Sequence, residues 1–397
     1  TVESILEHNP GFFKQFNIVI TSTLSDTLLL KLEKILWEFK IPLIIAYSIG
    51  FIGYIRITMP EHTETHHGNL EDLRIDCPWP ELKALASNFE LKNIKDNSYI
   101  QIPYVLILLN CISIWKLKNS KTLPHTYEEK EHFKQIIRSY MHEFDEERIK
   151  EVLSMAWKAS YTTSIPDDIQ YILKDNKCLC ISPEVNSYPL YKRSNMKPIQ
   201  QSSEFWILCR AVSDYISSEG NGLLPLSGIL PDMKSDSETY IKLQNTYKKY
   251  LISKLINTYR YHQKAKKDYE CVRKHVQSIL VSINQPVSKI SNEKIKLFCK
   301  QFKYIKLLRY RSLELEYKYP NSELIKTSFS TPNDLIAWYI ALRSYNKYRS
   351  AFGKYVGSEE ATLNEDTDRY IQLTKQFLSK FDCNITDFQI IACKELL

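Results

Sequence analysis

Phe16-Asn-Ile-Val-Ile-Thr21 and Pro42-Leu-Ile-Ile-Ala-Tyr47 are two apolar runs of the kind that form buried strands. Between them, residues 26–39 place Leu28, Leu29, Leu32, Ile35 and Leu36 at helical spacing. Two apolar strands joined by one helix predict a parallel sheet that is covered on both faces, the doubly wound arrangement that commonly binds nucleotides. Residues 50–57 then alternate like one more strand after a glycine turn.

The composition of the chain is that of an ordinary globular protein. It has 397 residues, of which 44% are hydrophobic and 25% charged, so disordered and collagen-like classes are excluded and two or three domains are expected. Only nine residues are glycine, which disfavours a fold rich in tight β-turns. The nine cysteines are scattered and include no C-x-x-C pair, which predicts reduced thiols in a cytoplasmic and nuclear protein.

Helical spacing dominates after residue 60. Thr126 with Glu129 forms a capping-box signature, and apolar stripes with the same period recur up to Phe381. We therefore expect an all-helical domain between roughly residues 100 and 380. The uncharged stretches 41–55 and 97–115 are interrupted by proline, glycine or polar residues, so we expect buried core there and no membrane span.

The positive charge is concentrated in one region. Residues 236–283 contain no proline or glycine, which predicts a long basic helix, and ten Lys or Arg stand against two acidic residues between Lys242 and Lys274. Seven more basic residues and no acidic one follow between Lys294 and Arg311. The interleaved aromatics are Tyr247, Tyr250, Tyr259, Tyr261 and Tyr269. This pattern allows a helical nucleic-acid-binding adaptor using residues 242–311, although such runs are more often solvated or protein-binding faces.

The motifs that would hold a nucleotide are absent from the sequence. There is no G-x-G-x-x-G, no G-x-x-x-x-G-K-[ST] and no G-x-S-x-G, and Gly220-Asn-Gly222 is explained by a helix exit. We therefore expect no cofactor and no catalytic residue.

Three clusters were weighed as chemical sites, and each has a simpler structural explanation. His62, His66 and His67 with Glu61 and Glu64 carry zinc or iron donors, but their setting predicts an exposed loop, so we expect no metal. Cys209 and Cys299 fall on apolar helix faces, which predicts buried structural thiols. Glu71, Asp72 and Asp76 could form an acid/base pair, but a solvated turn is the favoured interpretation.

Several long blocks of the sequence resemble one known family, the regulatory subunits of neddylation-activating enzymes in the ubiquitin-activating-enzyme superfamily. The blocks are residues 41–45, 50–57, 70–82 (LEDLRIDCPWPEL), 124–131 (PHTYEEKE), 203–208 (SEFWIL), and the series Leu224-Pro225, Pro231-Asp232-Met233 and Tyr240-Ile-Lys-Leu-Gln-Asn245. The similarity runs over nearly the whole chain.

The resemblance implies the non-catalytic half of a heterodimer. In that family the catalytic partner carries the ATP site, the zinc and the cysteine, adenylates the C-terminal glycine of a Nedd-type modifier, and then holds it as a thioester. The resemblance also implies a partial Rossmann-like adenylation half over residues 1–66, a helical domain in the position of the catalytic-cysteine domain over 67–384, and a return to the first half over 385–397. The residues that match the family's region for contacting the catalytic subunit are Asp232, Met233, Tyr240, Ile241, Leu243, Gln244 and Asn245.

The chain departs from the family pattern in three places. The family's first strand and helix would precede Thr1, and its closing strands would follow Leu397. Sixteen residues also lie between Tyr247 and Lys264, where the family has two. The extra residues amount to nearly four helical turns, so a straight helix could absorb them in phase, and an unremoved intron would explain them equally well.

Overall fold

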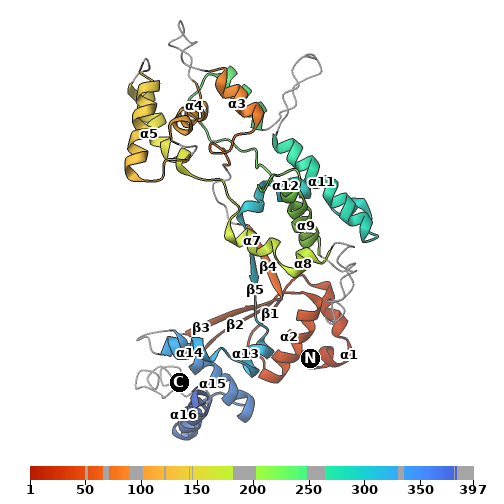
Figure 1. Ribbon diagram of the computed structural model, residues 1–397. Coiled ribbons are helices and arrows are strands. Elements are labelled where there is room, and N and C mark those ends of the chain that lie inside the picture. Colours follow the sequence, from red (N-terminus) through yellow and green to blue (C-terminus); the bar gives the residue numbers. More distant parts are fainter. Residues whose placement is uncertain are drawn as a thin grey trace. The chain divides into compact units, whose positions relative to one another are not determined.

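The computed structural model divides the chain into two compact units (Figure 1). We call residues 1–63 with 307–397 the sheet unit and residues 64–306 the helical unit. The structure describes residues 1–49, 52–65, 71–89, 102–119, 122–142, 144, 146–181, 203–247, 264–329, 335–379 and 381. The contacts thus group 307–381 with the N-terminal strands, whereas the expected division placed residues up to 384 in the helical domain. The expected return over 385–397 lies outside the described residues.

The sheet unit begins with α1 (Val2–His8) and η1 (Pro10–Gln15), followed by β1 (Val19–Thr21), α2 (Asp26–Phe39), β2 (Leu43–Ile49) and β3 (Ile52–Thr58). Ser25 caps α2, because its side chain accepts a hydrogen bond from the Leu28 N–H, and serine is one of the preferred residues at this position. The strands are ordered β1-β2-β3, with β1 parallel to β2 and β2 antiparallel to β3. The predicted strand, helix, strand unit is confirmed, but the sheet is mixed because β2 and β3 form a hairpin.

Helices cover one face of this sheet. Leu32 and Leu36 of α2 pack with Leu43 and Ile45 of β2 in one core cluster. The rest of the unit comprises α13 (Leu313–Lys318), α14 (Ser322–Phe329), α15 (Ile336–Phe352), η9 (Glu360–Thr362) and α16 (Leu363–Ser379). On the other face Ile20 and Ile55 are 67% and 75% exposed. The expectation of a sheet covered on both faces is therefore wrong for the described residues.

The helical unit is built of many short helices. They are α3 (Pro80–Ser87), α4 (Tyr104–Lys118), α5 (Tyr127–Tyr140), α6 (Glu146–Met155), η3 (Ala156–Ser160), α7 (Asp167–Leu173), α8 (Asn176–Leu179), α9 (Glu204–Ser217), α10 (Ser237–Tyr247), α11 (Lys264–Ser282), η7 (Val287–Lys289), α12 (Asn292–Gln301) and η8 (Phe302–Tyr304). Nine residues of α4 are buried, which confirms that this apolar stretch is core. Among the described residues no helix is long and apolar enough to cross a bilayer. The capping box of Thr126 and Glu129 is present at α5.

Two strands correct the sequence interpretation. β4 (Glu61–Thr65) pairs with β5 (Ile305–Arg309), so the region from 100 to 380 is not all helical. The run Ile305-Lys-Leu-Leu-Arg309 is too short to show a period, and its pairing partner lies more than 200 residues away. Glu61, His62 and Glu64 accordingly lie on a strand, not on the expected loop, and His66 and His67 lie outside the described residues. α10 and α11 lie within the two ends of the predicted long basic helix, and residues 248–263 between them lie outside the described part, so a single helix stays a prediction.

Candidate partner-binding surface

Hydrogen bonds at Lys234 and Asp236 hold the start of α10, the helix that carries most of the predicted interface residues. Asp236 caps the helix, since its Oδ1 accepts from the Thr239 N–H at 2.8 Å. Two residues earlier the Lys234 carbonyl accepts from Nη2 of Arg148 at 2.9 Å, and the same guanidinium donates to the Ile102 carbonyl and pairs with Glu151. Arg148 is buried, so the entry to α10 is anchored to the core of the helical unit.

One side of α10 belongs to that core. Thr239, Leu243, Thr246 and Tyr247 are buried. The Tyr247 hydroxyl donates to the Leu73 carbonyl at 2.6 Å, and its ring lies edge-on to Trp79 with 4.8 Å between centroids. Burial raises the pKa of the Tyr247 phenol well above its ordinary value. Tyr247 was one of the aromatics considered for stacking on nucleic acid, and the structure places it where no base could reach.

The other side of α10 is open to solvent and carries most of the predicted interface residues. On α10, Ile241 and Gln244 are exposed and Tyr240 and Asn245 are half-buried, and Asp232 is exposed in the segment before the helix. At 100° per residue, positions 240, 241, 244 and 245 share one side of the helix. We call Asp232, Tyr240, Ile241, Gln244 and Asn245 the α10 surface.

The remaining two predicted interface residues face the core. Leu243 is fully buried, and Met233 packs against the same hydrophobic cluster. Leu243 can therefore support α10 from within but cannot touch another chain while the helix is folded. The 3.6-residue period of the helix places Leu243 and Ile241 on opposite sides of α10. Once the helix bounds are known, the spacing of the two residues therefore shows that they face different surroundings.

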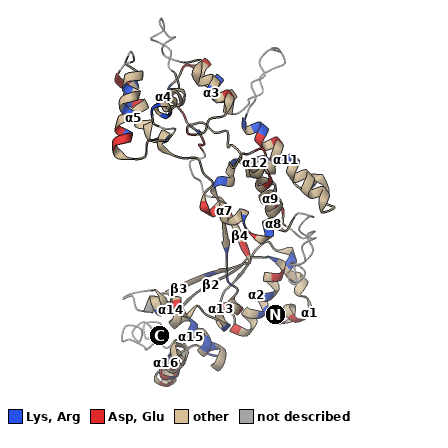
Figure 2. Ribbon diagram, viewed as in Figure 1, with Lys and Arg blue, Asp and Glu red and all other residues tan. Residues whose placement is uncertain are grey.

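The basic residues of α11 are largely paired. Lys264 contacts Asp268 at 2.6 Å, Lys266 contacts Glu270 at 3.7 Å, and Lys267 contacts Glu81 of α3 at 3.3 Å. Figure 2 shows acidic residues among the basic ones along this helix. α11 therefore does not present an uninterrupted positive stripe.

The three carboxylates at 71–76 are half-buried and each has a partner within the protein, so the expected solvated turn is wrong. Glu71 pairs with Lys158 at 2.7 Å. Asp76 accepts from the backbone N–H and the hydroxyl of Thr163, both at 2.6 Å. Asp72 Oδ2 accepts from Nε and Nη2 of Arg74, both at 3.2 Å. Each carboxylate has a partner already, and this explains why none is positioned as a free acid or base.

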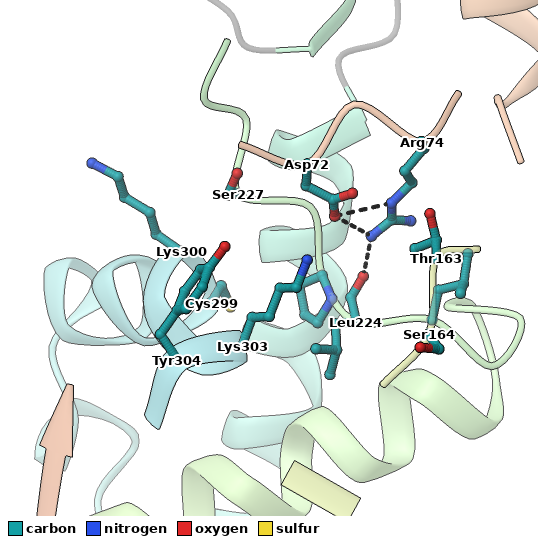
Figure 3. Close-up of a pocket in the computed structure, with 12 residues that line it drawn as sticks. Asp72, Arg74, Thr163, Ser164, Leu224, Ser227, Cys299, Lys300, Lys303 and Tyr304 are labelled. Carbon is teal, nitrogen blue, oxygen red and sulfur yellow. Dashed lines mark hydrogen bonds and ion pairs between the residues drawn. The ribbon is translucent and has the colours of Figure 1, made fainter. Parts of the chain in front are cut away.

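Asp72 and Arg74 also line a pocket in the helical unit (Figure 3). The other residues that line it are Thr163, Ser164, Leu223, Leu224, Pro225, Ser227, Cys299, Lys300, Lys303 and Tyr304. Arg74 is buried, and its guanidinium also donates to the Leu224 carbonyl. No motif predicted this pocket, because its walls come from four separate segments of the chain.

The thiols behave as the sequence predicts. Cys209 and Cys299 are buried, and burial raises the pKa of Cys209 well above its ordinary value and that of Cys299 to about 12. Such thiols are poor nucleophiles at neutral pH. Among the described residues, no group of three or more His, Cys, Asp or Glu side chains is arranged to hold a metal ion. Glu61 instead pairs with Arg309 at 2.9 Å.

Comparison with known proteins places this chain in a family. No protein-family model matches it. It is 34% identical over 392 residues to the NEDD8-activating enzyme E1 regulatory subunit AXL of Arabidopsis thaliana, covering 98% of this chain and 69% of that protein. It is 31% identical over 395 residues to the NEDD8-activating enzyme E1 regulatory subunit of Xenopus laevis, covering 97% of this chain and 68% of that protein. The chain therefore belongs to the family of NEDD8-activating enzyme E1 regulatory subunits.

Proposed function

We propose that this regulatory subunit is a non-catalytic scaffold that pairs with a catalytic subunit to activate a Nedd-type modifier. The similarity to regulatory subunits over 97–98% of the chain carries the proposal. The sequence supports it, because it has none of the common phosphate-binding motifs. The high pKa of the buried Cys209 and Cys299 also fits a subunit that leaves thioester formation to its partner. On this proposal the catalytic subunit supplies ATP binding, zinc and the reactive cysteine, and the isolated chain turns over no ATP.

Two finer features belong to the same proposal. The β1-α2-β2 unit, with its parallel strand pair, supports a partial Rossmann-like adenylation half. The α10 surface is proposed to contact the catalytic subunit. Ile241 is 51% exposed at the middle of that surface, and an exposed branched apolar residue beside polar neighbours is suited to an interface.

Co-purification with the catalytic subunit tests both levels of the proposal. Ile241→Asp should weaken heterodimer formation at least tenfold, which corresponds to about 1.4 kcal/mol. Leu297→Asp on α12 is the matched control, because Leu297 is 52% exposed in the same unit and lies outside the α10 surface. The control should bind within about twofold of wild type, and both variants should keep the wild-type melting temperature.

The outcomes separate the two levels. If the unmodified chain and the catalytic subunit do not co-elute, the scaffold function is wrong. If they co-elute and Ile241→Asp binds as well as wild type, the function stands and the α10 surface is wrong.

We also propose that the protein acts in the cytoplasm and nucleus, on the basis of its scattered cysteines. A fluorescent fusion that enters the secretory pathway would contradict this. The alternative of a helical nucleic-acid adaptor using residues 242–311 is not supported by the relatives. It predicts binding to DNA or RNA that falls steeply with salt, which a filter-binding assay would detect.

A further inference from the structure

The pocket at Asp72 and Arg74 lies entirely within the helical unit and has no role in the proposed heterodimer surface. Its walls come from the loop before α3, the segment between η3 and α7, the segment after α9, and the end of α12 with η8. In Figure 3 the Lys303 side chain points toward Asp72, whereas Lys300 lines the pocket and its amine is directed outward. None of the residues of the α10 surface lines it.

The lining of this pocket has an excess of positive charge. Arg74, Lys300 and Lys303 stand against Asp72 alone, so the lining sums to 3 − 1 = +2. Arg74 and Asp72 satisfy each other. Among the residues that the structure describes, neither Lys300 of α12 nor Lys303 of η8 has a carboxylate within 4.0 Å, whereas Lys294 of α12 pairs with Glu204. These two lysines are the cations of the basic segment 294–311 that line this pocket.

The part of the pocket wall that Arg74 forms is held rigidly. Arg74 has a left-handed backbone with φ of 48°, a conformation that costs a non-glycine residue energy and persists only where surrounding contacts enforce it. Those contacts are the bonds from Arg74 to Asp72 and to the Leu224 carbonyl, and the bond from Tyr247 to the adjacent Leu73 carbonyl. A pocket wall that is fixed in this way needs no reordering when a ligand binds.

The chemistry of the lining selects among anions. The Arg74 guanidinium already donates two hydrogen bonds to Asp72. It is therefore not available for the bidentate hydrogen bonds by which arginine favours phosphate. The lysines remain as single point charges. Leu224, Pro225 and Cys299 are apolar residues of the lining, and they suit the methylene groups of an acidic side chain.

We propose that this pocket binds a glutamate side chain of an acidic peptide segment, with Lys303 and Lys300 neutralising its carboxylate. Lys300 is exposed and Lys303 is half-buried. The peptide would belong to a protein partner, because a lone carboxylate bound by lysines that solvent reaches gains little unless a neighbouring chain adds contacts. The site is separate from the α10 surface, so it can be tested without the catalytic subunit.

Fluorescence anisotropy with the full chain and a labelled Gly-Glu₆-Gly peptide tests the proposal. The variant Lys300→Glu/Lys303→Glu should weaken peptide binding at least tenfold. The charge-matched control is Lys296→Glu/Lys306→Glu, which alters two exposed lysines of the same basic segment outside the pocket. This control should change affinity by less than about threefold. The milder Lys300→Gln/Lys303→Gln variant should also lose binding, which guards against misfolding of the charge-reversed protein.

Three results would overturn the proposal. In the first, the peptide does not bind the wild-type protein at millimolar concentration. In the second, Lys300→Glu/Lys303→Glu and Lys296→Glu/Lys306→Glu lose the same affinity, which would mean that only the overall charge matters. In the third result a labelled oligothymidine binds wild type more tightly than the peptide at the same salt and is lost in the pocket variants, which would make the pocket a nucleic-acid site.

Discussion

Tyr247→Phe removes one oxygen atom from the centre of the helical unit. The hydroxyl donates to the Leu73 carbonyl at 2.6 Å, and the side chain is fully buried, so no water is at hand to replace the lost bond. The phenylalanine ring keeps the edge-on contact with Trp79. Deleting one partner of a buried hydrogen bond costs about 1–3 kcal/mol, because the other partner is left without its donor. For a unit of this size the melting temperature should fall by roughly 2–4 °C for each kcal/mol.

Urea unfolding followed by circular dichroism would measure this change, with Tyr127→Phe as the control. Tyr127 is 79% exposed at the start of α5, so loss of its hydroxyl should change the free energy of unfolding by less than about 0.5 kcal/mol. If Tyr247→Phe is as stable as wild type, or if the control loses as much, the hydroxyl does not hold the loop before α3 to α10. The rigid pocket wall inferred from that bond would then lose its support.

Three further predictions concern single sites. Burial raises the pKa of the Glu33 carboxyl, so its contribution to stability is complete below 4.5 and declines as pH rises through the higher folded-state pKa. Wild type should therefore lose stability relative to Glu33→Gln between pH 4.5 and 7 in thermal melts, and a constant difference would contradict this. Gly220→Ala should cost about 1–3 kcal/mol, because a Cβ would lie 2.7 Å from the Leu223 carbonyl oxygen. Gly53→Ala, where nothing lies within 4 Å, is the control, and equal losses in denaturant melts would refute the steric argument. In native protein at pH 8 the half-buried Cys180 should react with iodoacetamide at least tenfold faster than Cys209 by mass spectrometry, since Cys209 is buried and its pKa is raised. Comparable rates would show that the α9 core opens readily.

The local elements of this fold were largely predictable, because helices carry their signal within one segment. The bounds of α2 agree with the predicted 26–39, and the capping box at Thr126 marks the start of α5. The strand pair β4 and β5 was missed for the opposite reason. Each strand is five residues long, and the pairing that stabilises it joins positions far apart in the sequence.

The candidate sites were predicted less completely. The family resemblance identified α10, but residue type alone could not show that Leu243 faces inward while Ile241 faces solvent. Glu71 and Asp76 looked solvated because their partners, Lys158 and Thr163, are 87 residues away in the sequence. The partner of Asp72, Arg74, is only two residues away, but its burial could not be predicted from the sequence. The pocket could not be predicted because its lining residues, such as Arg74 and Lys303, are far apart in the sequence and line one cavity only after the chain has folded.

The pairing of β4 with β5 has a consequence for how the protein can be engineered. The boundary between the units falls inside both strands, so the helical unit is one continuous insert whose two ends are neighbours. An inserted domain whose two ends lie close together can be exchanged without distorting the domain that carries it. A short turn joining the two strands could replace all of it, and the excised piece could be circularised or grafted into another host as a self-contained cassette.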